Sequence, residues 1–328
     1  CSVALFGAVV YSGRIYRLLR GEISYGEGVV MLLFLAFIFR GRTTDLVSGN
    51  VSPVLGFLIA FAVYSWLKGR GVAVGTAMIP LLLFKALTLT WCPLLFLRDI
   101  RWRTIATLAF WTILLNGLTW WLAGPEIYRH FFDEIVPKMA IPAGEGIVAK
   151  VFKYFGIYPA WVYTMLKGVG CAAIYWGYWR RFNEPSQRRE VTIVAALAGT
   201  IAIFCIFNFC IWYHYFPNYL AFPFMGWLVW EWEQARGFWR WMIGGTIAGV
   251  GVIVGAEWMI KGTLFHLVGG HAVEWYLRFI HDPGFVLVLP ALYLVFALRR
   301  LYGNSGPDIA TRKVDGGFWL SSTEGKPA

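Results

Sequence analysis

The chain has 328 residues, of which 59% are hydrophobic and only 14% are charged, and its mean hydropathy is +0.60. A soluble domain is closer to half apolar and a quarter charged, so this composition excludes an ordinary soluble domain and indicates an all-α polytopic membrane protein. The net charge of +11 comes from Lys and Arg in short segments between apolar runs. That pattern is typical of cytoplasmic loops and argues against nucleic-acid binding.

Apolar runs and the breaks between them predict about ten transmembrane helices, some of them shorter than the roughly 20 residues of a full span and therefore short or broken. The first run begins at Cys1, so we expect further residues before it, with a lipidated N-terminal cysteine as the alternative. We predict a transmembrane domain over 1–298 and a polar cytoplasmic tail over 299–328. In chain order the predicted segments are 1–11, 28–39, 51–67, 71–84, 86–97, 104–123, 157–178, 190–213, 216–230, 241–259 and 284–298.

Lys and Arg in short loops set the orientation of a membrane protein, because cytoplasmic loops carry them in excess. If 71–97 crossed the membrane once, the basic segments on either side of it, 68–71 and 98–103, would lie on opposite faces. Two short passes, 71–84 and 86–97, place both on the cytoplasmic side and put Lys85 at the outer turn. There it avoids the bilayer centre, where a lysine costs about 2.5–3.5 kcal/mol. With this parity all the basic segments are cytoplasmic: 14–20, 68–71, 98–103, 180–190, 231–240 and the tail from Arg299.

The same parity places five segments outside, and together they contain every histidine of the chain. Titratable groups are therefore concentrated on the extracytoplasmic face, where His is the natural acid, base or phosphate donor. Within 124–156 we expect an amphipathic surface helix, with His130 on its solvated face. The outer segments are 40–50, the Lys85 turn, 124–156, 213–218 and 260–283, and the histidines are His130, His214, His266, His271 and His281.

Three outer features have side chains suited to a phosphate-bearing ligand, although each also has an ordinary structural interpretation. Arg42 is a planar donor for phosphate, but it also suits a simple ion pair with Asp45. Lys85 suits an anionic lipid headgroup, or merely extends to the interface. His214 lies among aromatic residues at a helix end, as a catalytic or a belt histidine would. His266 and His271 lack acidic partners at metal-ligand helical spacing, so we expect no metal site.

The order of these motifs resembles glycosyltransferase family 87, the polyprenol-phosphate-dependent mannosyltransferase-like proteins of the GT-C superfamily. The resemblance covers roughly 40–230. It rests on DLVSGNVSPVLGFL (45–58), the central lysine, PLLFLRDIRWR (93–103), GPEIY (124–128) and WYHY (212–215).

The resemblance implies a GT-C-like helical bundle in a membrane, expected to be the bacterial inner membrane. It implies transfer of a mannose-like sugar from a polyprenyl-phosphate donor to a lipid or glycan acceptor on the extracytoplasmic face, without a cofactor. Carried over by residue, Asn50 lies near the donor, Lys85 approaches the lipid phosphate, and His214 matches the first histidine of the late motif.

The general base that the resemblance implies, a carboxylate in the first outer loop, has no counterpart in this chain. Asp45 and His214 are the available candidates for catalysis, and Lys85, Arg42, Asn50 and His214 for donor binding. Two expectations therefore stay open. Either the base precedes Cys1 and the protein is an enzyme, or the protein is an inactive structural subunit packed with other membrane-protein subunits. A lipid-linked sugar transporter is a third alternative.

Overall fold

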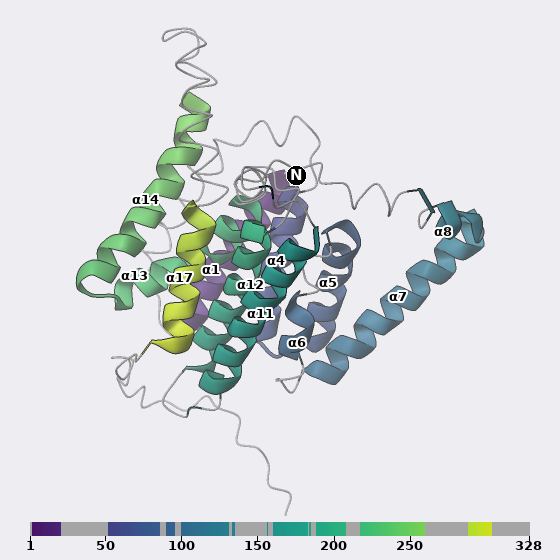
Figure 1. Ribbon diagram of the computed structural model, residues 1–328, viewed down its shortest axis with the longest axis horizontal. Coiled ribbons are helices and arrows are strands. Elements are labelled where there is room, and N and C mark those ends of the chain that lie inside the picture. Colours follow the sequence, from purple (N-terminus) through teal and green to yellow (C-terminus); the bar gives the residue numbers. More distant parts are fainter. Residues whose placement is uncertain are drawn as a thin grey trace, which may run out of the picture.

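The computed structural model describes residues 2–20, 52–85, 90–95, 100–130, 133–134, 156, 160–182, 184, 188–207, 217–259 and 288–303. Throughout these residues the ordered elements are helices and no strand occurs, as the predicted all-α class requires (Figure 1). The longer helices are α1 (Ser2–Arg20), α4 (Ser52–Leu67), α5 (Gly71–Lys85), α7 (Arg101–Ala123), α11 (Ala160–Phe182), α12 (Arg189–Phe207), α13 (Phe222–Gln234), α14 (Gly237–Met259) and α17 (Leu289–Tyr302). The shorter elements are α6 (Cys92–Leu95), α8 (Glu126–His130) and the π-helical turn η3 (Pro217–Ala221).

Two of the described helices, α7 and α12, are long and apolar enough to cross a membrane. On α7, Trp102 and Trp121 are both well exposed and stand nineteen residues apart, which is about 28 Å along a helix. Tryptophan favours the two membrane interfaces, and the hydrocarbon core is roughly 30 Å thick, so the spacing matches one bilayer. The helices and the apolar composition together identify an integral membrane protein.

A glycine turn reverses the chain between α4 and α5. Gly69 has φ = 68°, a left-handed conformation that glycine adopts without steric cost. The backbone N–H of Gly69 donates to Trp66 O at 3.0 Å, and that of Arg70 to Ser65 O at 2.9 Å, so the last carbonyls of α4 are satisfied. The two helices therefore pack antiparallel. The sequence predicted this, since it placed the basic turn 68–71 between two passes, 51–67 and 71–84.

Helices α5 and α7 begin side by side and run parallel. Thr104 Oγ1 donates to Gly71 O at 3.1 Å, and Trp111 Nε1 to Thr76 Oγ1 at 3.2 Å, so both helices advance in the same direction. The basic residues at their starts, in 68–71 and 100–103, consequently lie at the same end of the bundle. The stretch 71–97 is therefore not a single crossing of the bundle, because the chain returns to the end at which α5 began.

Of the second pass predicted over 86–97, the structure describes residues 90–95. These residues are helical, with a short turn at 90–91 that leads into α6. Trp91 already packs edge-on against Trp66 near the end of α4, with ring centroids 6.3 Å apart. The described residues of this segment therefore lie at the same end of the bundle as the Gly69 turn.

Contacts between distant helices bring the other basic segments to that same end. Gly7 of α1 lies against Phe57 and Arg14 lies over the Tyr64 ring, which makes α1 and α4 parallel. Arg188, just before α12, donates to Leu19 O at 2.7 Å, and Tyr16 donates to Glu233 Oε1 at 2.6 Å. We call this the arginine-rich end, at the bottom of Figure 1. It is made of the described residues 14–20, 68–71, 100–103, 180–182, 184, 188–190, 231–240 and 299–300.

The helices extend beyond several predicted boundaries because backbone hydrogen bonding continues past the last apolar residue. The first predicted segment, 1–11, is α1 and continues to Arg20, and 284–298 continues as α17 to Tyr302. Arg and Lys have good helix propensity and are favourable near a helix C-terminus, so these basic residues form last turns rather than loops.

Candidate functional site

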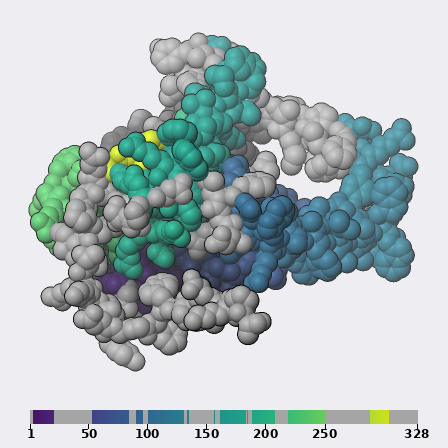
Figure 2. All heavy atoms as spheres, turned by 90° about the horizontal axis from the view of Figure 1, so that it is seen from below, coloured from purple at the N-terminus to yellow at the C-terminus, as the bar shows by residue number. Residues whose placement is uncertain are grey.

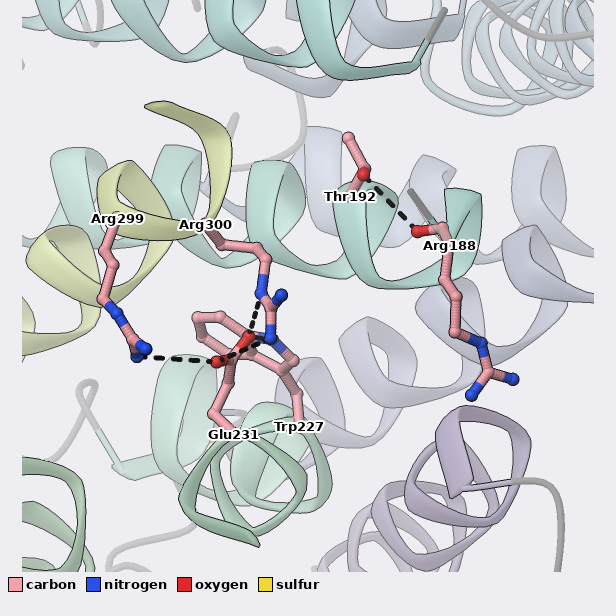
Figure 3. Close-up of polar contacts among 6 residues, drawn as sticks. All are labelled: Arg188, Thr192, Trp227, Glu231, Arg299 and Arg300. Atoms are coloured by element: carbon pink, nitrogen blue, oxygen red, sulfur yellow. Dashed lines mark hydrogen bonds and ion pairs between the residues drawn. The ribbon is translucent and has the colours of Figure 1, made fainter. Parts of the chain in front are cut away.

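The arginine-rich end has a buried polar centre at Glu231 of α13 (Figure 3). Arg300 of α17 donates to its two carboxylate oxygens, through Nε at 2.8 Å and Nη2 at 3.1 Å. Trp227 Nε1 donates to Glu231 Oε1 at 3.2 Å, and the Arg299 guanidinium lies 3.9 Å from Oε2. Glu231 is 2% exposed and Arg300 is 8% exposed. The bidentate pairing offsets the free-energy cost of burying the carboxylate, and it holds α13 against α17.

Two further contacts hold the ends of other helices at this end. Arg181 of α11 donates from Nε to Leu301 O at 3.1 Å and from Nη2 to Gly303 O, so it caps the last carbonyls of α17. Its Nη1 also donates to Glu184 Oε2 at 2.6 Å. Near α1, Arg20 lies 3.7 Å from Glu233. These contacts fix helix ends, and they present no exposed reactive group.

Sequence reasoning assigned the basic residues of this end to loops and did not anticipate the ion pair between Glu231 and Arg300. One signal was available. Glu231 stands in the aromatic run WLVWEW, and a carboxylate in apolar surroundings needs a buried cationic partner. The partner itself could not be found from the sequence, because 69 residues separate it from Glu231.

The residues predicted to bind donor or to catalyse fall mostly outside the described part of the chain. Arg42, Asp45, Asn50 and His214 are outside it, and Lys85 is described as the last residue of α5 but not in its side chain. His130 is described, and it is exposed and pairs through Nδ1 with Glu134 Oε1 at 3.1 Å. A solvated face was expected there.

The described helix ends beside three of these residues nevertheless lie at one level, opposite the arginine-rich end. Asn50 precedes the start of α4 by two residues, Lys85 ends α5, and His214 precedes η3 by three residues. Because α4 and α5 share the Gly69 turn and have nearly equal lengths of 16 and 15 residues, Lys85 returns to the level of Ser52.

The turn η3 reaches the same level. Gly226 N donates to Ser12 Oγ at 2.9 Å, which sets α13 parallel to α1, and η3 packs against α4. The flanks of these three candidate residues, which are separated by up to 164 positions in sequence, thus gather around the first turns of α4.

The depth of Lys85 follows from the pairing of α5 with α7. Gly71 lies beside Arg103 and Thr104, and Lys85 follows Gly71 by fourteen residues, so it stands level with residues 117–118. Trp121 is three to four residues further along, about one helical turn, or roughly 5 Å. A lysine side chain can span that distance to reach an interface.

Within the described ranges, no group of three His, Cys, Asp or Glu side chains is close enough to hold a metal ion. The candidate groups at the opposite end stay those predicted from the sequence, Asn50, Lys85 and His214.

Helices that cross a membrane, with cationic segments collected at one end and polar residues flanking the other, define an integral membrane protein with two distinct faces. The model of glycosyltransferase family 87 matches residues 1–207 of this chain, and the chain belongs to that family. No curated protein and no solved structure matches it significantly.

Proposed function

We propose that this protein is a GT-C-type glycosyltransferase that takes a mannose-like sugar from a polyprenyl-phosphate donor and transfers it to a lipid or glycan acceptor. Membership of a glycosyltransferase family supports the reaction class. The observation that carries the assignment of the site is the common level of the helix ends beside Asn50, Lys85 and His214. In the proposed site, a cation, an amide and an imidazole would meet a lipid-borne phosphate at the membrane boundary.

In the proposed reaction, the acceptor hydroxyl oxygen attacks the anomeric carbon of the donor sugar, and the bond from that carbon to the lipid phosphate oxygen breaks. Lys85 and Arg42 would stabilise the negative charge that develops on the departing phosphate, and Asn50 would orient the sugar. His214 or Asp45 would take the hydroxyl proton. No cofactor and no metal ion enters this scheme.

The proposed orientation places the arginine-rich end in the cytoplasm and the site on the extracytoplasmic face, because basic residues accumulate on the cytoplasmic side. It includes a bundle of about ten transmembrane helices in a bacterial inner membrane and a cytoplasmic tail over 299–328. The contacts of Leu19 with Arg188, of Tyr16 with Glu233 and of Arg14 with Tyr64 near the end of α4 support a single cytoplasmic face.

Transfer of labelled sugar from polyprenyl-phosphate mannose by the purified full-length protein tests the proposal. We expect Lys85→Ala and His214→Ala each to lower the rate on the order of 10²-fold, the scale of one catalytic or phosphate-stabilising group. Lys68→Ala, which removes a cation from the arginine-rich end, is the matched control and should retain activity.

The enzymatic function would be contradicted if wild type and variants were equally inactive with several polyprenyl-phosphate donors and the protein co-purified stoichiometrically with another membrane complex. That result would identify a structural subunit.

A further inference from the structure

The arginine-rich end is electrostatically uneven. Its α11, α12, α13 and α17 side contains four described glutamates, Glu184, Glu190, Glu231 and Glu233, three of which pair with arginines. Its α1, α4, α5 and α7 side contains no acidic residue among those that the structure describes, and Asp99, which precedes α7, lies outside them. The described cations of this side are Arg14, Arg17, Arg20, Lys68, Arg70, Arg101 and Arg103.

Three cations on this second side form a compact group. Lys68 and Arg70 flank Gly69 in the turn between α4 and α5, and a Cβ built on Gly71 would stand 2.9 Å from the Cβ of Arg103. All three side chains are exposed, and none of them makes an ion pair with a described residue. We call Lys68, Arg70 and Arg103 the cation group.

The cation group borders an apolar surface. Helix α7 starts beside it and packs against α5 on one side only, and none of the apolar window of α7 is buried. Trp102, Phe110 and Ile113 are 67%, 59% and 73% exposed. Figure 2 shows α7 projecting from the edge of the molecule.

We propose that the cation group binds the phosphate headgroup of an anionic membrane phospholipid, whose acyl chains lie along the exposed face of α7. The charge selects an anion, and the apolar surface that continues from it selects a lipid over a soluble phosphate or an acidic protein. The first turn of α5 contains no acidic residue, so its positive helix end adds to the same potential. This site is separate from the proposed donor site, since it occupies the other end of α5.

The test measures association of spin-labelled phosphatidylglycerol and spin-labelled phosphatidylcholine with the full chain in phosphatidylcholine nanodiscs. We expect wild type to select phosphatidylglycerol at least about fivefold, the factor that a single cation near an anionic surface provides. The variant Lys68→Gln/Arg70→Gln/Arg103→Gln should lose this selection.

Two control variants separate charge from fold. Arg70→Lys/Arg103→Lys keeps the charges and should keep the selection, and Arg236→Gln removes an exposed arginine from the glutamate-containing side and should also keep it. Equal association of both lipids with wild type, or selection that survives in the triple variant, would overturn the proposal. Displacement of the lipid by 10 mM inorganic phosphate would also overturn it, because the site would then recognise free phosphate.

Discussion

Helices α12 and α7 pass the same test of length and apolarity, yet they occupy opposite environments. In α12, 83% of the apolar window is buried, whereas in α7 none of it is. Their residues explain the difference. α12 is rich in small side chains, which allow close helix approach, and α7 contains Trp102, Trp111, Trp120 and Trp121. Hydropathy thus predicts that a helix crosses the membrane, and the sizes of its side chains indicate whether it lies inside the bundle or at the rim.

The largest expected effect comes from the buried ion pair beside α12. Glu231→Ala leaves Arg300 buried without its carboxylate partner, which costs about 3–5 kcal/mol. We expect a large fall in the thermal unfolding midpoint in detergent. Glu134→Ala is the control at an exposed pair. It removes the partner of His130 and should change the unfolding midpoint little.

A double variant sharpens this test. Glu231→Met/Arg300→Met replaces the pair by apolar side chains of similar length and should recover most of the lost stability. If Glu231→Ala alone were as stable as wild type, the buried pair would not stabilise the fold as proposed.

A glycine in each helix provides the second test. A Cβ at Gly199 of α12 would lie 2.8 Å from Ile174 Cδ1 and 3.1 Å from Ala297 Cβ, whereas one at Gly117 of α7 meets nothing within 4 Å. Gly199→Leu should therefore destabilise by about 1–3 kcal/mol through overpacking. Gly117→Leu should be tolerated, as size-exclusion profiles and unfolding midpoints would report. Equal sensitivity at both positions would mean that α7 is covered like α12.

The smallest effect concerns the single buried hydroxyl that joins α7 to α5. Thr104→Val removes the bond to Gly71 O and should cost about 1 kcal/mol. Spin labels at Leu83 and Leu122, both exposed, should report a broader distance distribution in this variant. Thr119→Val, which removes a bond within α7 to Leu115 O, should leave the distribution unchanged.

Much of the topology was predictable from Lys and Arg alone. Loop charge predicts the antiparallel packing of α4 and α5, because few other arrangements keep basic segments on one face. It also predicts the common end of the described residues in 14–20, 68–71, 100–103, 180–182, 188–190 and 231–240. The helix ends were less predictable, since apolar runs stop at Arg20 or Arg299 while backbone hydrogen bonds continue. The single-turn α6 and the π-helical turn η3 have no periodic signal in so few residues.

The candidate residues could be proposed from the sequence, but the grouping of the helix ends beside them could not. Residue type identified Lys85 and His214, because an isolated cation and an imidazole are conspicuous in apolar sequence. That their flanks gather around α4 depends on α1 packing between α4 and α13, a long-range contact that no local pattern contains. The roles of Arg42, Asp45, Asn50, Lys85 and His214 stay predictions.

The sidedness of Lys85 tests the central claim most directly, because the proposed site requires it to face away from the arginine-rich end. In a cysteine-free background, single cysteines at Lys85, His214, Arg70 and Arg236 would be labelled in intact cells with a membrane-impermeant maleimide. We predict labelling at positions 85 and 214 from outside, and labelling at 70 and 236 only after the cells are opened. Labelling of positions 85 and 70 from the same side would contradict the account.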